Sequence, residues 1–326
     1  MYKAFYNLTR NPFEITPDPS FLIATKKHNE ALASLYYGVR RRKGFVVLTG
    51  EVGTGKTLLV RCLLEILRRA NVAFAYVFNS RLAPTEFLQY VAADFGLATA
   101  GKTKSELLLT LADFVISRSQ KNFTTVLVVD EAHHLSSDVL EEIRLLTNLE
   151  APQGKLLQIL LIGQPELDEK LDCDNLRQLK QRIALRSHLD PLELDETGEY
   201  IYRRLQMAGS PRPEAIFPME TILEIQRHSR GFPRLINVLC ENGLIQAYSK
   251  QAQAVTPEAI EEIAQDLRLN IVHRSVSEDA LSSDHRSDIR QVAQFLLDLY
   301  ERLARAQAEK PQLGEFVRTG KHEPYI

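Results

Sequence analysis

The chain has 326 residues, of which 44% are apolar and 25% charged, and its formal net charge at pH 7 is −2. This composition is typical of a soluble globular protein, and it excludes binding to nucleic acid or an anionic membrane through overall charge. The three cysteines are too widely spaced for a disulfide framework, and the sequence shows neither a secretory signal nor a bilayer-spanning apolar run, so we expect a cytoplasmic protein, peripheral at the inner membrane if it docks there.

The first part of the chain, residues 1–44, is a polar and aromatic lead-in that ends in a helical pattern. Beyond it, 45–191 alternates apolar runs with helical patterns, which predicts an α/β domain with a parallel sheet covered on both faces. The continuous apolar character of the runs indicates strands buried from both sides. The expected strands are 45–49, 73–79, 124–130, 156–163 and 183–190, and the expected helices between them include 84–95, 104–119 and 136–150.

After residue 191 the strand patterns stop, and 192–268 has the pattern of four helices, which we interpret as an all-helical lid domain. The remaining part, 269–326, is expected to hold a polar linker, an amphipathic C-terminal helix over 288–308 and a flexible tail. The apolar side of that helix suits partner docking or self-association, and packing back on the lid is the alternative.

A glycine-rich segment follows the first expected strand and opens the next helix. It reads Gly50, Glu51, Val52, Gly53, Thr54, Gly55, Lys56 and Thr57, which matches the P-loop pattern G-x-x-x-x-G-K-[ST] in its required context. The glycines allow several backbone N–H groups to point at one place, and the helix N-terminus adds positive potential for phosphates. Lys56 can reach the β- and γ-phosphates of ATP, and the Thr57 hydroxyl can ligate Mg²⁺.

The stretch VLVVDEAHHL, 126–135, admits three interpretations: an RNA-helicase box, a metal site, or the acidic half of an ATP site. The P-loop favours the third, because Asp130 ends an apolar strand and can hold Mg²⁺, while Glu131 can polarise a water as a general base. The adjacent residues His133 and His134 lack the i, i+4 spacing of a metal-binding pair. No second pattern of alternating strands and helices follows, which argues against a helicase.

Three further positions are candidates for stabilising charge on the γ-phosphate. Gln164 follows the fourth expected strand and could hold the attacking water if that strand lies beside the acidic one. Arg182, or alternatively Arg177, precedes the fifth strand and could act as an arginine finger on a neighbouring subunit. Arg234 opens a helix of the lid and could fold onto ATP, which would couple the nucleotide state to the lid angle.

The motifs GEVGTGKT, VLVVDEAH, LIGQPEL, RQLKQRI and GFPR follow the order found in AAA+ ATPases. The lead-in YNLTRNPFEITPDPSFLIATKKHNEAL resembles that of the ExeA family, the general secretion pathway protein A ATPases. The resemblance implies a P-loop AAA+ domain with a helical lid, ATP hydrolysis, and homo-oligomers, as rings or filaments, with the site at subunit borders. Carried over by motif, the positions are Lys56 and Thr57 (Walker A), Asp130 and Glu131 (Walker B), Gln164 (sensor 1, usually Asn, Thr or Ser), Arg182 (finger) and Arg234 (sensor 2).

Secretion members of this family often continue into a membrane span and a periplasmic part, and this sequence shows neither, which favours a shorter relative from a polysaccharide-export, exosortase or pilus locus. We expect an ATPase that assembles or remodels a cell-envelope machine, with protein partners in a membrane-associated export system. A DNA-associated ATPase of the transposition or loader type is the alternative, based on the basic run Arg40–Lys43. A nucleotide-gated scaffold is a third alternative, and Glu131 argues against it.

Overall fold

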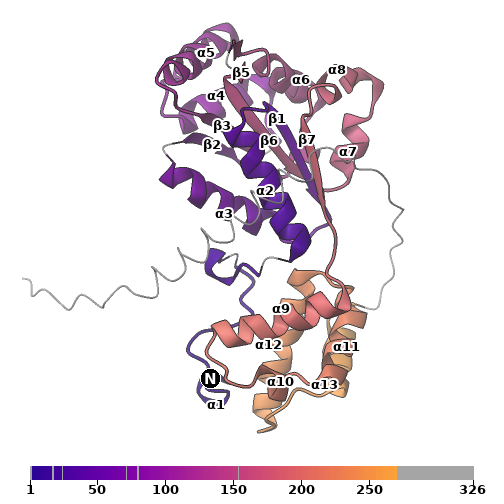
Figure 1. Ribbon diagram of the computed structural model, residues 1–326. Coiled ribbons are helices and arrows are strands. Elements are labelled where there is room, and N and C mark those ends of the chain that lie inside the picture. The colour runs from indigo at the N-terminus through magenta and orange to yellow at the C-terminus, as the bar shows by residue number, and fades with distance from the viewer. Residues whose placement is uncertain are drawn as a thin grey trace, which may run out of the picture.

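The computed structural model describes residues 2–269, apart from 17, 24, 71, 79, 80 and 153. The linker, the amphipathic helix over 288–308 and the tail expected from the sequence lie outside the described residues. Figure 1 shows an α/β part that carries the sheet and a helical part next to it, in agreement with the predicted fold class. Within the described part of the chain, no helix combines the length and apolar character that a membrane span requires.

Five parallel strands form the main sheet, in the order β2-β3-β6-β1-β7. They are β1 (Phe45–Gly50), β2 (Ala73–Val77), β3 (Thr125–Val129), β6 (Leu157–Gly163) and β7 (Leu185–Leu189). In β1, Phe45 and Val47 are buried in one cluster while Val46 and Leu48 are buried in the other, as successive side chains of a strand point to opposite faces. The order places β3 beside β6, so the segments that follow β1, β3 and β6 meet at one edge.

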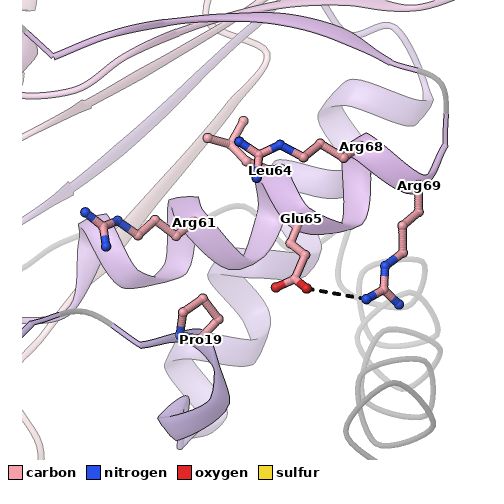
Figure 2. Close-up of a pocket in the computed structure, with 6 residues that line it drawn as sticks. All are labelled: Pro19, Arg61, Leu64, Glu65, Arg68 and Arg69. Carbon is pink, nitrogen blue, oxygen red and sulfur yellow. Dashed lines mark hydrogen bonds and ion pairs between the residues drawn. The ribbon is translucent and has the colours of Figure 1, made fainter. Parts of the chain in front are cut away.

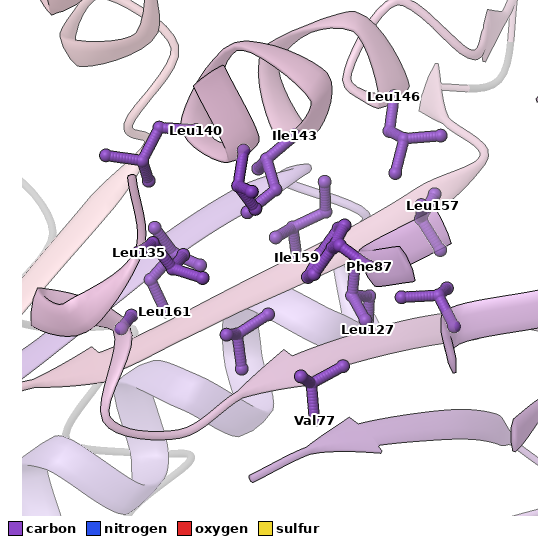
Figure 3. Packing of buried hydrophobic residues seen from close by; sticks show 14 of the residues in the cluster. Val77, Phe87, Leu127, Leu135, Leu140, Ile143, Leu146, Leu157, Ile159 and Leu161 are labelled. Atoms are coloured by element: carbon purple, nitrogen blue, oxygen red, sulfur yellow. The ribbon is translucent and has the colours of Figure 1, made fainter. Parts of the chain in front are cut away.

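Helices cover both faces of this sheet (Figure 1). One face carries α2 (Lys26–Arg40) and α3 (Lys56–Arg69), and the other carries α4 (Pro84–Asp94), α5 (Lys104–Gln120) and α6 (Ser137–Leu146). Figure 3 shows part of the cluster between the sheet and α4–α6, where Phe87 of α4 and Ile143 of α6 lie with Leu127 and Ile159 of the sheet. Each such buried side chain contributes about 1.5–3 kcal/mol, which fixes the strand ends that carry the motifs.

The helix expected over 136–150 is wrong in its last four residues. α6 ends at Leu146, and the Thr147 hydroxyl then donates to the Arg144 carbonyl at 2.6 Å. A hairpin of β4 (Glu150–Ala151) and β5 (Gly154–Lys155) precedes β6 and is absent from the sequence-based prediction, because two-residue strands show no periodicity. Between β6 and β7 the chain forms α7 (Glu166–Leu171), η3 (Asp174–Leu176) and α8 (Arg177–Lys180).

The helical part has its own core, which includes Ile201 and Ile225. It contains α9 (Leu194–Met207), α10 (Pro213–Ile216), α11 (Met219–Ser229), α12 (Pro233–Ser249) and α13 (Pro257–Asp266). The short α10 is additional to the four expected helices. α13 begins where the sequence indicates, since Thr256 Oγ1 accepts the Ala259 N–H and Pro257 stands in the first turn.

The lead-in packs on the helical part before it reaches the sheet. α1 (Tyr2–Phe5) lies against α12 (Figure 1), and the Tyr2 hydroxyl donates to Glu241, 2.9 and 2.8 Å from its two carboxylate oxygens. Farther along, Arg204 of α9 donates to the Pro12 carbonyl and stacks on Phe21 of η1 (Pro19–Phe21). The chain therefore passes between the lid core and the sheet twice: from lid to sheet through the lead-in, and from sheet to lid after β7.

Candidate nucleotide site

The glycine-rich segment forms a loop between the end of β1 at Gly50 and the start of α3 at Lys56. Gly53 (φ 88°) and Gly55 (φ 99°) have the left-handed backbone that glycine adopts without steric cost. A Cβ on Gly53 would lie 3.0 Å from the Cβ of Arg234, so the loop has no room for a side chain there. A loop of this form presents backbone N–H groups and a helix N-terminus to a phosphate.

Lys56 is the buried cation of the loop, with 6% of the residue exposed. Its Nζ donates to the Gly50 carbonyl at 2.6 Å and to the Glu51 carbonyl at 2.9 Å. Burial lowers the pKa of Lys56, and the charges of Glu131 and Asp130 oppose that shift. The ammonium group is therefore held by the loop and lies within the field of the acidic residues that follow β3.

Asp130 follows β3 and is 4% exposed. Its Oδ2 accepts from the Tyr76 hydroxyl at 2.7 Å and lies 3.4 Å from Thr57 Oγ1, while its Oδ1 accepts the Glu131 N–H at 2.9 Å. Burial and then the charge of Asp130 raise the pKa of Tyr76, which keeps the phenol a donor. The oxygens of Thr57 and Asp130 come together from α3 and β3, and they are the hard ligands that Mg²⁺ takes, so these residues fit that ion.

Glu131 has a left-handed backbone, with φ 51° and ψ 37°. This conformation costs a residue other than glycine about 1–3 kcal/mol and is characteristic of functional sites. The hydrogen bond from its N–H to Asp130 and one to its carbonyl from the His134 N–H (3.0 Å) stabilise it. Its side chain is 46% exposed, but Oε2 is buried and lies 3.5 Å from Nδ1 of His133.

Gln164 lies at the end of β6, beside β3, and its side chain contacts an imidazole. Its Nε2 is 3.0 Å from His133 Nε2, and its backbone N–H donates to His133 Nδ1 at 3.3 Å. The side chain of His133 is 7% exposed, and burial, followed by the neighbouring His134, lowers its pKa. The ring of His133 therefore lies between Gln164 and Glu131.

The two candidate finger arginines lie at the opposite edge of the sheet. Ala184, just before β7, donates its N–H to the carbonyl of Phe45 at the start of β1, whereas the P-loop follows the end of β1. The six residues of β1 separate these edges by about 20 Å. Arg182 Nη1 donates to Thr147 Oγ1 at 2.6 Å, and Arg177 is exposed at the start of α8. The structure thus brings neither arginine to the P-loop of its own chain.

Arg234 lies beside the P-loop at the start of α12. Its N–H donates to the Gly53 carbonyl at 3.3 Å, and its side chain is exposed. The turn before α12 is held at Gly231, whose carbonyl accepts the Leu192 N–H at 2.8 Å. A Cβ at this glycine would lie only 1.9 Å from the carbonyl oxygen of Leu192, so a larger residue does not fit. The lid therefore contacts the loop through its backbone at this position.

Three residues of the site were given no role in it from sequence motifs, although His133 was considered as a metal ligand. Tyr76 of β2 holds Asp130, His133 holds Gln164, and His28 of α2 donates to the Thr54 carbonyl at 2.9 Å. Each contact joins separate elements, so no local pattern marks it. The parallel pairing of β2 with β3 is the one feature that could have pointed to Tyr76.

Residues 39–171 match the family model of the AAA domain. The chain is an AAA+ protein. This AAA+ protein is 43% identical over 256 residues to general secretion pathway protein A of Aeromonas hydrophila. The match covers 78% of this chain and 46% of the relative, so the chain spans about half the length of the relative it matches.

Solved structures share the fold of this AAA+ protein. The Aeropyrum pernix ORC2 protein matches with a TM-score of 0.58 and 18% identity, over 79% of this chain and 71% of that chain. The Aeropyrum pernix ORC1 protein in complex with DNA matches with a TM-score of 0.59 and 19% identity, over 79% of this chain and 69% of that chain. At these identities the likeness concerns the fold alone.

Proposed function

We propose that this AAA+ protein hydrolyses ATP to ADP and phosphate and uses the reaction to assemble or remodel a cell-envelope machine for secretion, pilus formation or polysaccharide export. The observation that carries the hydrolytic part is the convergence of Lys56, Thr57 and Asp130 at one edge of the sheet. The likeness to general secretion pathway protein A supports the second part.

Nucleotide binding begins at the loop. Lys56 exchanges the carbonyls of Gly50 and Glu51 for the β- and γ-phosphate oxygens, and its buried position spares it a change of solvation at that step. Thr57 and Asp130 would hold Mg²⁺, which when bound neutralises charge on the phosphates.

Glu131 is the proposed general base for the water that attacks the γ-phosphate. Its strained backbone and the Asp130 hydrogen bond set the direction in which its carboxylate leaves the strand. Gln164 is the proposed residue that holds the attacking water, and the contact of its side chain with His133 fixes its position beside Glu131.

Arg182, or alternatively Arg177, is the proposed finger on the ATP of a neighbouring copy. Both arginines lie before the amino end of β7, about one strand length from the P-loop of the same chain. This distance supports action on the ATP of another copy. A homo-oligomer, as a ring or a filament, follows if the two edges of successive copies meet. Arg234 is the proposed sensor in the same chain, since its helix start touches Gly53.

Replacing Lys56 with alanine tests the nucleotide site. We expect nucleotide affinity to fall at least about 100-fold, because the buried cation facing the phosphates is lost. Titration with a fluorescent ATP analogue and phosphate release measure the two effects, and circular dichroism checks the fold. Lys121→Ala, at the end of α5, is the matched control with unchanged affinity. Turnover by Lys56→Ala at the parental rate would contradict the proposal.

The envelope role is tested in cells with Glu131→Gln, which should bind ATP without turning it over and so hold its client. Crosslinking is expected to recover proteins of a membrane-associated export system from the inner-membrane fraction. The Lys56→Ala protein is the control that should release them. Recovery of transposition or replication proteins instead would overturn the envelope assignment.

A DNA-associated ATPase of the transposition or loader type is the second candidate. The run Arg40–Lys43 ends α2 at the amino-end edge of the sheet, and Arg40 and Arg41 are exposed there. Binding to duplex DNA that weakens steeply with salt, and is lost when Arg40 and Arg41 are replaced by serine, would support it. Absence of binding at about 50 mM salt would remove it.

A further inference from the structure

His28 is a buried, titratable residue that the hydrolytic steps above do not use. It stands in the first turn of α2 and is 6% exposed. Its Nε2 lies 2.9 Å from the carbonyl oxygen of Thr54, inside the P-loop, and its Nδ1 lies 2.9 Å from Oγ1 of Thr25. The ring therefore joins the end of the lead-in to the phosphate loop.

The partners of the two ring nitrogens determine the tautomer. A carbonyl oxygen only accepts, so Nε2 carries the hydrogen that bonds to Thr54. Nδ1 then accepts the hydroxyl hydrogen of Thr25, whose oxygen also accepts the N–H of His28 at 3.4 Å as the N-cap of α2. Burial lowers the pKa of His28, which keeps the ring neutral. The helix start thus fixes the orientation of the ring.

The same ring edge supports the loop sterically. A Cβ on Gly55 would lie 3.1 Å from Nε2 of His28, so the glycine backbone packs directly on the imidazole. Thr54 is fully buried, and its hydroxyl donates to the Glu51 carbonyl at 2.9 Å. The Thr54 carbonyl is directed at His28, so the N–H of Gly55, in the same planar peptide, points the opposite way.

His28 also lies near the junction of the two domains. The adjacent Lys27 forms an ion pair at 2.6 Å with Asp190, which directly follows β7. The charge of Glu196, in the first turn of α9, acts on His28. A change of lid angle would therefore be felt next to the residue that holds Thr54.

We propose that His28 is a positioning residue that holds the P-loop in its phosphate-binding form by donating to the Thr54 carbonyl, an inference that rests on the proposed nucleotide site. Without this donor a buried carbonyl is left unsatisfied, and the loop gains by rotating that peptide toward another partner. The rotation turns the following N–H group away from the phosphates. Nucleotide affinity then falls more than the rate of the chemical step, because the base Glu131 is on another strand.

Two nearly isosteric variants separate this role from a packing role. In His28→Gln the longer side chain brings an amide N–H to the place of Nε2, whereas in His28→Asn the amide reaches only the place of Nδ1. The two variants are compared with the parent by Kd for fluorescent ADP, by KM and kcat for ATP, and by Tm. We expect His28→Gln to stay within about threefold of the parent and His28→Asn to bind ADP about tenfold more weakly, with kcat changed less than KM.

Amide hydrogen exchange of 50–57 in the nucleotide-free protein gives a readout that does not depend on turnover. His28→Asn is expected to speed exchange there and His28→Gln is not. Equal behaviour of the two variants in affinity and exchange, or parental affinity in His28→Asn, would overturn the proposal. A parent that binds ADP but never releases phosphate would refute hydrolysis and leave the His28 result intact.

Discussion

The two edges of the parallel sheet hold charged residues in different environments. At the carboxyl-end edge, Lys56 and Asp130 are buried, and each has hydrogen-bond partners in the loop or a neighbouring strand. At the amino-end edge, Lys155 pairs with Glu150, with side chains 29% and 62% exposed. Buried charges persist only when they are paired and hydrogen-bonded. The charges of the first edge are therefore organised by contacts within one chain, in a form suited to binding a ligand. The second edge is accessible to another molecule.

With Arg182 as the proposed finger, this difference predicts how hydrolysis depends on assembly. Arg182 belongs to the exposed edge, and Glu131 belongs to the buried one. An arginine about 20 Å from its own loop stabilises γ-phosphate charge only if another copy presents its loop. Binding of nucleotide should therefore be a property of one chain, and turnover a property of two.

The largest effect is expected from a substitution at the exposed edge. Arg182→Ala should lower kcat about 1,000-fold at full nucleotide occupancy, because the γ-phosphate charge loses its partner. Phosphate release at saturating ATP measures it, and ADP affinity should be unchanged. Arg177→Ala tests the competing candidate, and Thr147→Val removes the hydrogen bond of Arg182 while keeping the guanidinium.

Mixing two inactive variants tests whether Arg182 acts on the ATP of another copy or on the ATP of its own chain. An Arg182→Ala copy retains an intact loop, and a Lys56→Ala copy retains an intact arginine. Their mixture should regain turnover that rises with protein concentration. If the mixture stays inactive while Arg182→Ala alone still assembles, the assignment of Arg182 as a finger fails.

The next effect concerns the buried edge. Glu131→Gln should lower kcat about 100-fold or more while ATP affinity is kept, because a neutral amide cannot take a proton from water. Glu150→Gln is the matched change at the exposed edge and should leave kcat within about twofold. Equal rates for Glu131→Gln and the parent in every oligomeric state would refute the enzymatic role.

The buried edge was largely predictable, because its signals are local. The P-loop pattern, the apolar run of β3 and the acidic residues after it lie within short windows, and the strand order β2-β3-β6-β1-β7 then brings them together. The contacts that complete the edge are not local. Tyr76 reaches Asp130 from a strand 54 positions earlier, and His28 reaches Thr54 from 26 positions away.

The lead-in shows the same limit on a larger scale. The resemblance identified its sequence, but its packing on the lid depends on pairs such as Tyr2 and Glu241, 239 positions apart. The hairpin β4–β5 was missed for the opposite reason, because each strand is too short to show alternation. Periodicity reveals elements of five or more residues, and it carries no information on which distant elements touch.

Tyr76→Phe should have a smaller effect at the buried edge. Asp130 loses one of its donors, and a supporting residue of this kind typically changes metal affinity or activity about tenfold. The Mg²⁺ concentration that gives half-maximal phosphate release should rise by about that factor. Tyr37→Phe, near the end of α2 at the other edge, is the control without this shift. An unchanged Mg²⁺ requirement in Tyr76→Phe would show that its hydroxyl does not orient Asp130.

The smallest expected effect is a difference in how the two edges respond to pH. Burial lowers the pKa of His28 and of His133 below the ordinary value of 6.5, so the unfolded chain takes up more protons than the folded one as the solution is acidified. Their contribution to the free energy of unfolding is therefore complete above pH 6.5 and is lost below it, with a slope of up to about 1.4 kcal/mol per pH unit for each histidine.

At the exposed edge the corresponding loss comes later. The hydrogen bond and charge of Lys155 lower the pKa of Glu150 below 4.5, so that ion pair contributes above pH 4.5 and is lost as the pH falls further. Urea unfolding from pH 8 to pH 5 should show the first loss alone. His28→Gln and His133→Gln together should flatten the curve between pH 6.5 and 5, because the carboxylates of the exposed edge stay ionised in that window. A parental slope in the double variant would mean that other groups take up these protons.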